Sequence, residues 1–145
     1  MISSPLARTR QTAERLGPPV TVDDRWVEMD YGIYDGMPLD DVPTGIWDRW
    51  LGDPAWGPEG GESHLDLDRR VRSACDDLWD DATAADVVVV SHVSPIKVAV
   101  AWALGVGVEA TWRMHLDTAS ICRVGRGRTG PSLVSFNETA CRPSI

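Results

Sequence analysis

The sequence predicts an α/β domain built on a mostly parallel sheet with helices on both faces. Val87-Val88-Val89-Val90 is a run of four β-branched residues without polar alternation, which is typical of a strand buried on both faces of such a sheet. Helical patterns precede and follow this run, and that alternation favours parallel strands joined by helical crossovers. A single domain is expected over residues 1–145, because the chain has the usual length of one domain.

The N-terminal half is expected to hold a helix, a short strand and a long loop. Ser3-Ser4-Pro5-Leu6 predicts a helix start, with a serine as N-cap and proline at the first helical position. Gly17-Pro18-Pro19 ends that helix, and Val20-Thr21-Val22 is a strand candidate. Residues 38–61 carry four prolines and three tryptophans. We expect a short helix around Trp47 inside a long irregular lid there.

The C-terminal half alternates helix, strand and helix before a hairpin. Residues 63–79 carry apolar side chains at helical spacing along one face. The strand of the valine run is expected over residues 86–91, and a second Ser-Pro start predicts a helix over residues 96–104 before a glycine. Residues 118–124 and 132–136 are predicted to form two strands around a Gly/Arg-rich turn, as a hairpin at the edge of the sheet.

The composition argues against several classes of protein. Fourteen Lys plus Arg against 22 Asp plus Glu give a net charge of −8, so no nucleic-acid partner is expected, because phosphate backbones need a basic face. A local arginine group can still hold a small anionic substrate. No membrane partner is expected, because no apolar stretch is long enough to span a bilayer. Arg8 and Arg10 lie where a signal peptide would be apolar.

The cysteines and histidines do not have the spacing of a metal site. His64 and the pair His115 and Asp117 do not place two imidazoles on one helix face, so no metal and no other cofactor is expected. The cysteines are too few and too scattered for a disulfide framework, and we expect reduced core thiols in a cytoplasmic protein. These residues are Cys75, Cys122 and Cys141.

The main candidate site follows the valine run. The strand ends at His92, and a helix is expected to begin within three residues. Ligands of open α/β sheets bind beyond the carboxyl ends of the strands, and a helix N-terminus offers N–H groups and partial positive charge to an anion. His92 and Val93 are therefore candidate phosphate-binding residues, and a protonated His92 would oppose the negative charge. The alternative is a histidine that caps the strand end for structural reasons.

Two further residue types suit phosphate chemistry. Arg8 and Arg10 lie in the first turns of the N-terminal helix, and arginine offers the planar, bidentate donors that phosphate prefers. The alternative is a pair of solvated arginines on an exposed face. Glu28 is flanked by Trp26 and Met29, and apolar surroundings favour the protonated form of a carboxyl, which suits a general acid. The alternative is a solvated glutamate at a strand end.

Four stretches occur in an order and at a spacing that together form one pattern, namely residues 3–13, 28–36, 60–63 and 88–92. They resemble the motifs of the histidine phosphatase superfamily, which has the phosphoglycerate mutase-like fold. The resemblance runs from residue 2 to about residue 139. In finer detail the chain is most similar to acid phosphatases, in particular the phosphatase half of ribonuclease H–acid phosphatase proteins, and also to α-ribazole phosphatases.

The resemblance implies a phosphomonoesterase of the acid phosphatase type that works through a phosphohistidine intermediate without a metal. Its partner would be a small phosphorylated substrate or inorganic phosphate. By this resemblance, Arg8 matches the arginine that binds the phosphoryl group. Glu28 matches the proton donor to the leaving oxygen, and His92 matches the second active-site histidine. The stretch that orders the pocket wall matches Gly61, Glu62 and Ser63.

The nucleophile of the family is a histidine in an Arg-His-Gly motif at the end of a central first strand. No Arg-His-Gly occurs in these 145 residues. The resemblance thus implies a domain without the first strand and first helix, and a chain that is inactive alone. Losing a central strand exposes two sheet edges, so a homodimer that covers this seam is expected. Two other functions stay open, a non-catalytic phosphate-binding or interaction module and a phosphoglycerate mutase.

Overall fold

A computed structural model describes residues 1–82 and 84–140, with only the backbone of Leu39. Its centre is a parallel sheet of three short strands in the order β2-β1-β3. β1 (Ile2–Ser3) pairs with β2 (Thr21–Val22) on one side and with β3 (Val89–Val90) on the other. Ile2 lies opposite both Thr21 and Val89. The predicted parallel sheet is confirmed.

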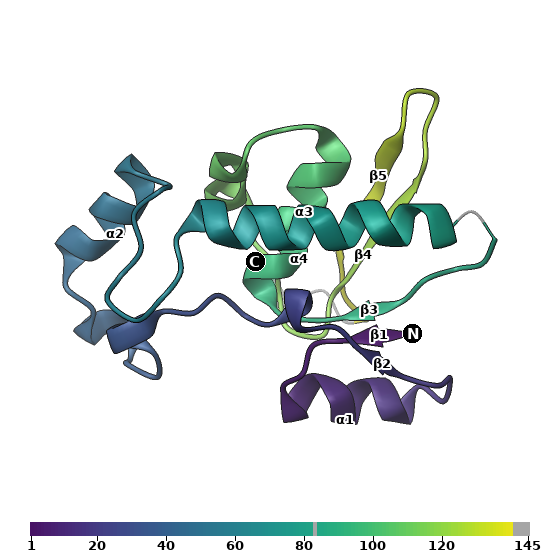
Figure 1. The fold of residues 1–145 in the computed structure, drawn as a ribbon, viewed down its shortest axis with the longest axis horizontal. Coiled ribbons are helices and arrows are strands. Elements are labelled where there is room, and N and C mark those ends of the chain that lie inside the picture. Colours follow the sequence, from purple (N-terminus) through teal and green to yellow (C-terminus); the bar gives the residue numbers. More distant parts are fainter. Residues whose placement is uncertain (83, 141–145) are drawn as a thin grey trace.

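Helices lie on both sides of this sheet (Figure 1). α1 (Ala7–Arg15) packs on one side, against β1 and β3. α3 (His64–Asp81) and α4 (Val93–Leu104) pack against each other on the opposite side. The predicted α/β class with helices on both faces is confirmed.

α3 follows the amphipathic pattern in its sequence. Ser63 caps its first turn in a capping box, in which the serine hydroxyl accepts from the Asp66 N–H and Asp66 reaches back to the Ser63 N–H. Its apolar stripe forms the centre of the core, together with residues of α2, α4 and the adjoining loops. That core consists of Trp26, Met29, Trp50, Leu67, Val71, Ala74, Cys75, Val98 and Val108.

The lid contains the short helix that the sequence predicts, α2 (Thr44–Gly52), which lies beside the start of α3 (Figure 1). Irregular chain surrounds it, with short 3₁₀-helical turns here and elsewhere at Asp24–Trp26, Gly32–Tyr34, Leu39–Asp41 and Val108–Arg113. Cys75 and Cys122 are free thiols, and Cys141 lies outside the described residues. Among the described helices, none combines the length and apolarity needed to cross a membrane.

The predicted hairpin forms, but it is not an edge of the central sheet. β4 (Ile121–Arg126) and β5 (Pro131–Glu138) pair antiparallel and make a separate two-stranded sheet. The hairpin packs against α4 instead. Within the described part of the chain, no strand pairs with the outer edge of β3.

The valine run is less buried than its composition predicts. Only Val89 and Val90 are in a strand, both are half-buried, and Val88 is 45% exposed. The predicted strand over residues 86–91, buried on both faces, is therefore wrong in length and burial. The physical reason is that β3 pairs with β1 alone, so it is an edge strand of this sheet.

Both Ser-Pro helix starts are displaced from their predicted positions. α1 has Leu6 as its N-cap, without a side-chain cap, because the Ser4 hydroxyl binds a distant partner instead. α4 begins at Val93 with His92 as N-cap, so Ser94 and Pro95 lie inside the first turn. Proline is tolerated there because the first turn lacks intrahelical N–H partners.

Candidate functional site

The ends of β1 and β3 bring three side chains together. Ser4 follows β1, and His92 follows β3 as the N-cap of α4. The Ser4 Oγ lies 2.8 Å from Nε2 of His92, and Nη2 of Arg8 lies 3.0 Å from Nδ1 of the same ring. The structure thus places Arg8 and His92 in one site, at the carboxyl ends of parallel strands, where the sequence predicts a ligand.

These contacts fix the protonation of the His92 ring. A guanidinium group can only donate hydrogen bonds, so Nδ1 of His92 accepts from Arg8. The proton of the neutral ring then lies on Nε2, which donates to the Ser4 Oγ. His92 is only 8% exposed, whereas Arg8 is an exposed side chain. The site therefore combines the buried, neutral imidazole of His92 with the exposed guanidinium group of Arg8.

The electrostatics favour the neutral form of His92 in the resting site. Burial lowers the pKa of His92 below its usual 6.5, and the positive charges of Arg8 and Arg70 lower it further. The carboxylate of Glu28 acts in the opposite direction. At neutral pH the positive charge of the resting site therefore comes from Arg8.

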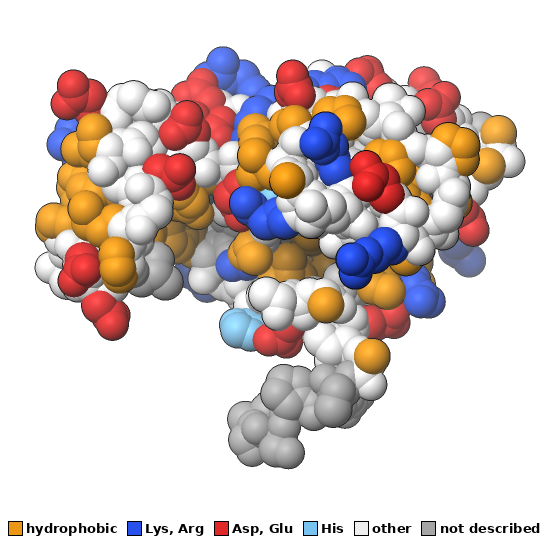
Figure 2. All heavy atoms as spheres, turned by 90° about the horizontal axis from the view of Figure 1, so that it is seen from below, with side chains coloured by type: hydrophobic (Ala, Val, Ile, Leu, Met, Phe, Trp, Pro, Cys, Tyr) orange, Lys and Arg blue, Asp and Glu red, His pale blue; other side chains and the backbone are white. Residues whose placement is uncertain are grey.

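The surface around Arg8 is basic although the chain is acidic. Arg8, Arg10 and Arg15 all belong to α1. Figure 2 views the molecule from the α1 side and shows basic side chains gathered over that helix. Such a local excess of positive charge attracts a small anion against the net charge of −8.

Glu28 lies at the start of α4, close to His92 in space. Its Oε1 accepts from the N–H of Ser94 at 3.2 Å and from its own neighbour Met29 at 2.8 Å. The carboxylate thus already accepts the hydrogen bond of one N–H group at the N-terminus of α4. The sequence predicts that the N–H groups there bind a phosphate. Val93 is the first residue of α4, and its side chain is 37% exposed.

Arg70 positions Glu28, and the sequence analysis did not identify it. It extends from α3 and donates from Nη1 to the carbonyl oxygens of Arg25 and Val27, at 2.7 and 2.8 Å. Its Nη2 donates to the carbonyl of Glu28 at 3.3 Å, and its guanidinium pairs with Glu62. No sequence pattern marks Arg70, because its carbonyl partners lie 42 to 45 residues away in the chain.

The predicted pocket-wall residues contact the loop that follows Glu28. The N–H of Glu62 donates to the Asp30 carbonyl at 3.0 Å, and Oε1 of Glu62 accepts from the Asp30 N–H at 3.1 Å. A Cβ on Gly61 would lie 2.7 Å from the Asp30 carbonyl, so only glycine fits that contact. Ser63 caps α3. These residues hold the loop after Glu28, and their role as a pocket wall stays a prediction.

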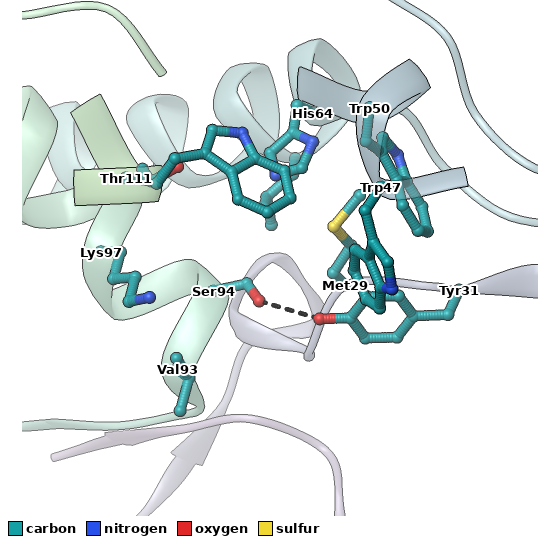
Figure 3. Close-up of a pocket in the computed structure, with 11 residues that line it drawn as sticks. Met29, Tyr31, Trp47, Trp50, His64, Val93, Ser94, Lys97 and Thr111 are labelled. Atoms are coloured by element: carbon teal, nitrogen blue, oxygen red, sulfur yellow. Dashed lines mark hydrogen bonds between the residues drawn. The ribbon is translucent and has the colours of Figure 1, made fainter. Parts of the chain in front are cut away.

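A cavity of about 140 Å³ opens beside the first turn of α4 (Figure 3). Three tryptophans and Tyr31 form part of its wall, and the Tyr31 hydroxyl lies 3.3 Å from the Ser94 Oγ within it. Burial raises the pKa of Tyr31, so this phenol stays protonated at neutral pH. The lining consists of Met29, Tyr31, Trp47, Trp50, His64, Leu67, Val93, Ser94, Lys97, Thr111 and Trp112.

The other two histidines lie away from His92. His64 is buried in the cavity wall against the rings of Trp50 and Trp112, and its Nδ1 has no hydrogen-bond partner among the described residues. His115 is 83% exposed at its side chain and contacts Asp117. In the described ranges, no group of three or more His, Cys, Asp or Glu could hold a metal. The metal-free mechanism stays a prediction.

The buried histidines predict a loss of stability in mild acid. Burial lowers the pKa of His64 and His92 below 6.5 in the folded chain, so the unfolded chain binds more protons below that pH. The two neutral rings make their full contribution to the free energy of unfolding above roughly pH 6.5, and this contribution declines as the pH falls through that value. Urea unfolding at roughly pH 7.5 and 5.5 measures this difference. We expect His64→Gln to reduce the change in the free energy of unfolding between the two pH values and the exposed His115→Asn to serve as the control. An equal change in both variants would contradict the assignment of this pH dependence to buried histidines.

Comparison with known proteins agrees with this geometry. A family profile described as "Histidine phosphatase superfamily (branch 1)" matches residues 1–139. The bifunctional protein Rv2228c of Mycobacterium tuberculosis is 40% identical over 128 residues, which cover 83% of this chain and 35% of that protein. Phosphoserine phosphatase 1 of Hydrogenobacter thermophilus is 32% identical over 126 residues, 81% of this chain and 60% of that one. The chain thus spans about a third and three fifths of the lengths of these curated relatives.

Solved structures share the fold over nearly the whole chain. The structure of the mycobacterial glucosyl-3-phosphoglycerate phosphatase Rv2419c with inorganic phosphate superposes with a TM-score of 0.81. It is 27% identical, and the match covers 97% of this chain and 77% of that one.

Proposed function

Because the chain belongs to the histidine phosphatase superfamily, we propose that it supplies the phosphoryl-binding and proton-donating side of a phosphomonoesterase. One observation carries the proposal, namely the placement of a buried His92 between Ser4 and an exposed Arg8 at the ends of two parallel strands. An anion that enters there meets a guanidinium group and an imidazole, both of which donate hydrogen bonds to phosphate oxygens.

Phosphate binding exchanges one contact for another. A phosphate oxygen replaces the His92 ring as the acceptor for Arg8, and Nδ1 of His92 loses the guanidinium N–H that it accepts in the resting chain. The freed Nδ1 can then take up a proton and donate it toward the anion. The favourable charge of imidazolium on phosphate raises the His92 pKa in the complex. Binding is therefore coupled to proton uptake.

Glu28 would complete the chemistry of a phosphomonoester. Its carboxyl lies at the first turn of α4, where it can protonate the leaving oxygen as the P–O bond breaks. In the second half-reaction the carboxylate would take a proton from the water that attacks phosphorus and releases the histidine. Arg8 and His92 stabilise the charge on the transferring group in both steps.

The nucleophile of this reaction would be a histidine that this sequence does not supply. His92 is on the phosphate-binding side, His64 is enclosed in the tryptophan cavity, and His115 is exposed beside Asp117. We therefore propose that the chain needs an Arg-His-Gly segment from elsewhere to form a phosphohistidine. The natural assembly, including a homodimer over the open edge of β3, belongs to the same proposal.

The same absence of a placed nucleophile favours a second candidate, a phosphate-binding module without turnover. Both candidates require the anion site, and they differ only in whether a supplied histidine restores hydrolysis.

Titration calorimetry with inorganic phosphate or vanadate tests the site. We expect weak binding that Arg8→Ala and His92→Ala abolish, whereas Arg10→Ala, which removes a neighbouring exposed cation of α1, reduces the affinity only slightly. Affinity is expected to weaken as the pH rises from roughly 5.5 to 7.5, because His92 must be protonated in the complex. Equal affinity in the wild type and in both site variants would refute the proposal.

A further inference from the structure

The tryptophan-lined cavity contains one feature that phosphate binding leaves unused, the amine of Lys97. Lys97 is the only lysine in the 145 residues, and the other basic residues are arginines. It lies in the second turn of α4, and its side chain extends toward the cavity (Figure 3). The chain therefore places its one lysine side chain beside the candidate site.

This ammonium group has no carboxylate partner in the described part of the chain. No ion pair includes Lys97, and the cavity lining contains no Asp or Glu. Burial lowers the pKa of Lys97, and the field of the Glu28 carboxylate raises it. Oε1 of Glu28 accepts from the N–H groups of Met29 and Ser94 and not from Lys97. His64 is no countercharge either, because an imidazole is neutral or cationic. A half-buried cation in this position has room for an anionic group of a ligand.

The remaining wall and the volume of the cavity indicate a single ring. Trp47, Trp50, Trp112 and Tyr31 all line it. Its volume of about 140 Å³ is close to the ~150 Å³ of a protein cavity that accommodates benzene. The hydroxyls present are already engaged, Tyr31 with Ser94 and Thr111 with the Val108 carbonyl. Since a sugar needs several free partners, an aromatic ring fits this wall better than a polyhydroxylated one.

Residues of the first turn of α4 link the cavity to the proposed phosphate site. Ser94 donates its N–H to Glu28, the proposed acid, and contributes its hydroxyl to the cavity. Val93 also lines the cavity and directly follows His92. A phosphomonoester with its phosphate at Arg8 and His92 would therefore direct its leaving group into this cavity.

We propose that the cavity is the leaving-group site for a phosphomonoester whose leaving group is a single aromatic ring bearing a carboxylate, with the carboxylate on Lys97 and the ring against Trp112 and Trp47. This inference rests on the proposed phosphatase function and adds its substrate class.

Product binding tests the inference without requiring turnover. The probes are 4-hydroxybenzoate, which has ring and carboxylate, benzyl alcohol, which has the ring alone, and glycerate, which has the carboxylate alone. Calorimetry, supported by tryptophan fluorescence, is expected to give 4-hydroxybenzoate about tenfold higher affinity than either single-feature probe, the size of one charge-assisted hydrogen bond. Equal affinities for the three probes would overturn the inference.

Two substitutions separate the contributions of the cation and the ring. Lys97→Met is expected to remove the advantage of 4-hydroxybenzoate over benzyl alcohol, and Trp112→Leu to weaken both ring compounds. Trp112 is 38% exposed, so its replacement leaves the core intact. Arg10→Met is the control for loss of an exposed cation. A preference for 4-hydroxybenzoate that survives Lys97→Met would contradict the role of Lys97.

The single lysine also allows a direct readout of occupancy. Reductive methylation with ¹³C-formaldehyde keeps the charge and labels two amines, Lys97 and the N-terminus of Met1. We expect 4-hydroxybenzoate to shift the Lys97 resonance and not that of Met1. Phosphate affinity is measured on the same sample. If phosphate binds and the Lys97 resonance does not respond, the substrate class is wrong and the phosphate site stands; if phosphate does not bind, the proposed function itself fails.

Discussion

The 145-residue chain is expected to hydrolyse p-nitrophenyl phosphate at little more than the background rate. Removing the nucleophile of a covalent mechanism lowers the rate constant by on the order of 10⁶-fold, although the remaining electrostatics leave a residual activity. His64 and His115, the two histidines outside the proposed phosphate site, lie in the cavity wall and on the exposed surface. Ser91 is no substitute, because its hydroxyl donates to the carbonyl of Trp26 at 2.7 Å.

Supplying the missing group is expected to restore hydrolysis. The outer edge of β3 has no strand neighbour among the described residues, so an added strand can pair there. An apolar strand that ends in Arg-His-Gly, fused through a flexible linker, is expected to switch on turnover and raise stability by covering this edge. The matched control carries Arg-Ala-Gly and should stabilise without turnover. Rapid turnover by the unextended chain, lost on His92→Ala, would show that the proposed mechanism is wrong.

Arg70→Met is expected to lower the free energy of unfolding by about 2–4 kcal/mol, because it leaves half-buried carbonyl and carboxylate groups without a donor. The Arg70 and Glu62 side chains are 19% and 17% exposed, and Arg70 also donates to three backbone carbonyls. Methionine keeps an unbranched, flexible side chain but offers no hydrogen-bond donor. Arg70→Lys keeps the charge and loses the planar fork, so its loss is expected to be intermediate.

Urea unfolding measures this effect, and a neighbouring arginine provides the control. Arg69 pairs with Asp66 on the surface, where its side chain is 76% exposed. Arg69→Met is expected to cost less than about 1 kcal/mol, as is usual for exposed ion pairs. If Arg70→Met were as mild as Arg69→Met, the carbonyl contacts would not be what holds the Glu28 segment in place.

The sequence was sufficient to predict the parallel sheet, the amphipathic helix α3 and the identity of His92, Arg8 and Glu28 as neighbours. The sheet and the helix follow from local patterns, whereas the grouping of the three site residues follows from the resemblance to the histidine phosphatase superfamily. Strand length could not be predicted in the same way. The valine run predicts a buried strand, but the actual burial of Val88 and Val90 depends on which strands lie beside them.

The helix starts show a second limit of local patterns. Ser4 has the residue type of an N-cap, yet its hydroxyl contacts His92, a partner 88 residues away. Arg70 and Lys97 were missed for a related reason. Arg70 binds carbonyl groups, which carry no residue-specific pattern, and Lys97 acquires its meaning only from the aromatic wall around it.

The contact between Ser4 and His92 also has a kinetic consequence. It joins residues separated by 88 positions, and the Arg8–His92 contact spans 84. Closing loops of this length costs entropy before any contact compensates it, so such contacts form slowly compared with those within α3 or the hairpin. If the anion site is assembled only after the folding transition state, phosphate will slow unfolding and leave the refolding rate nearly unchanged. Phosphate would then extend the lifetime of the folded chain without helping it to fold.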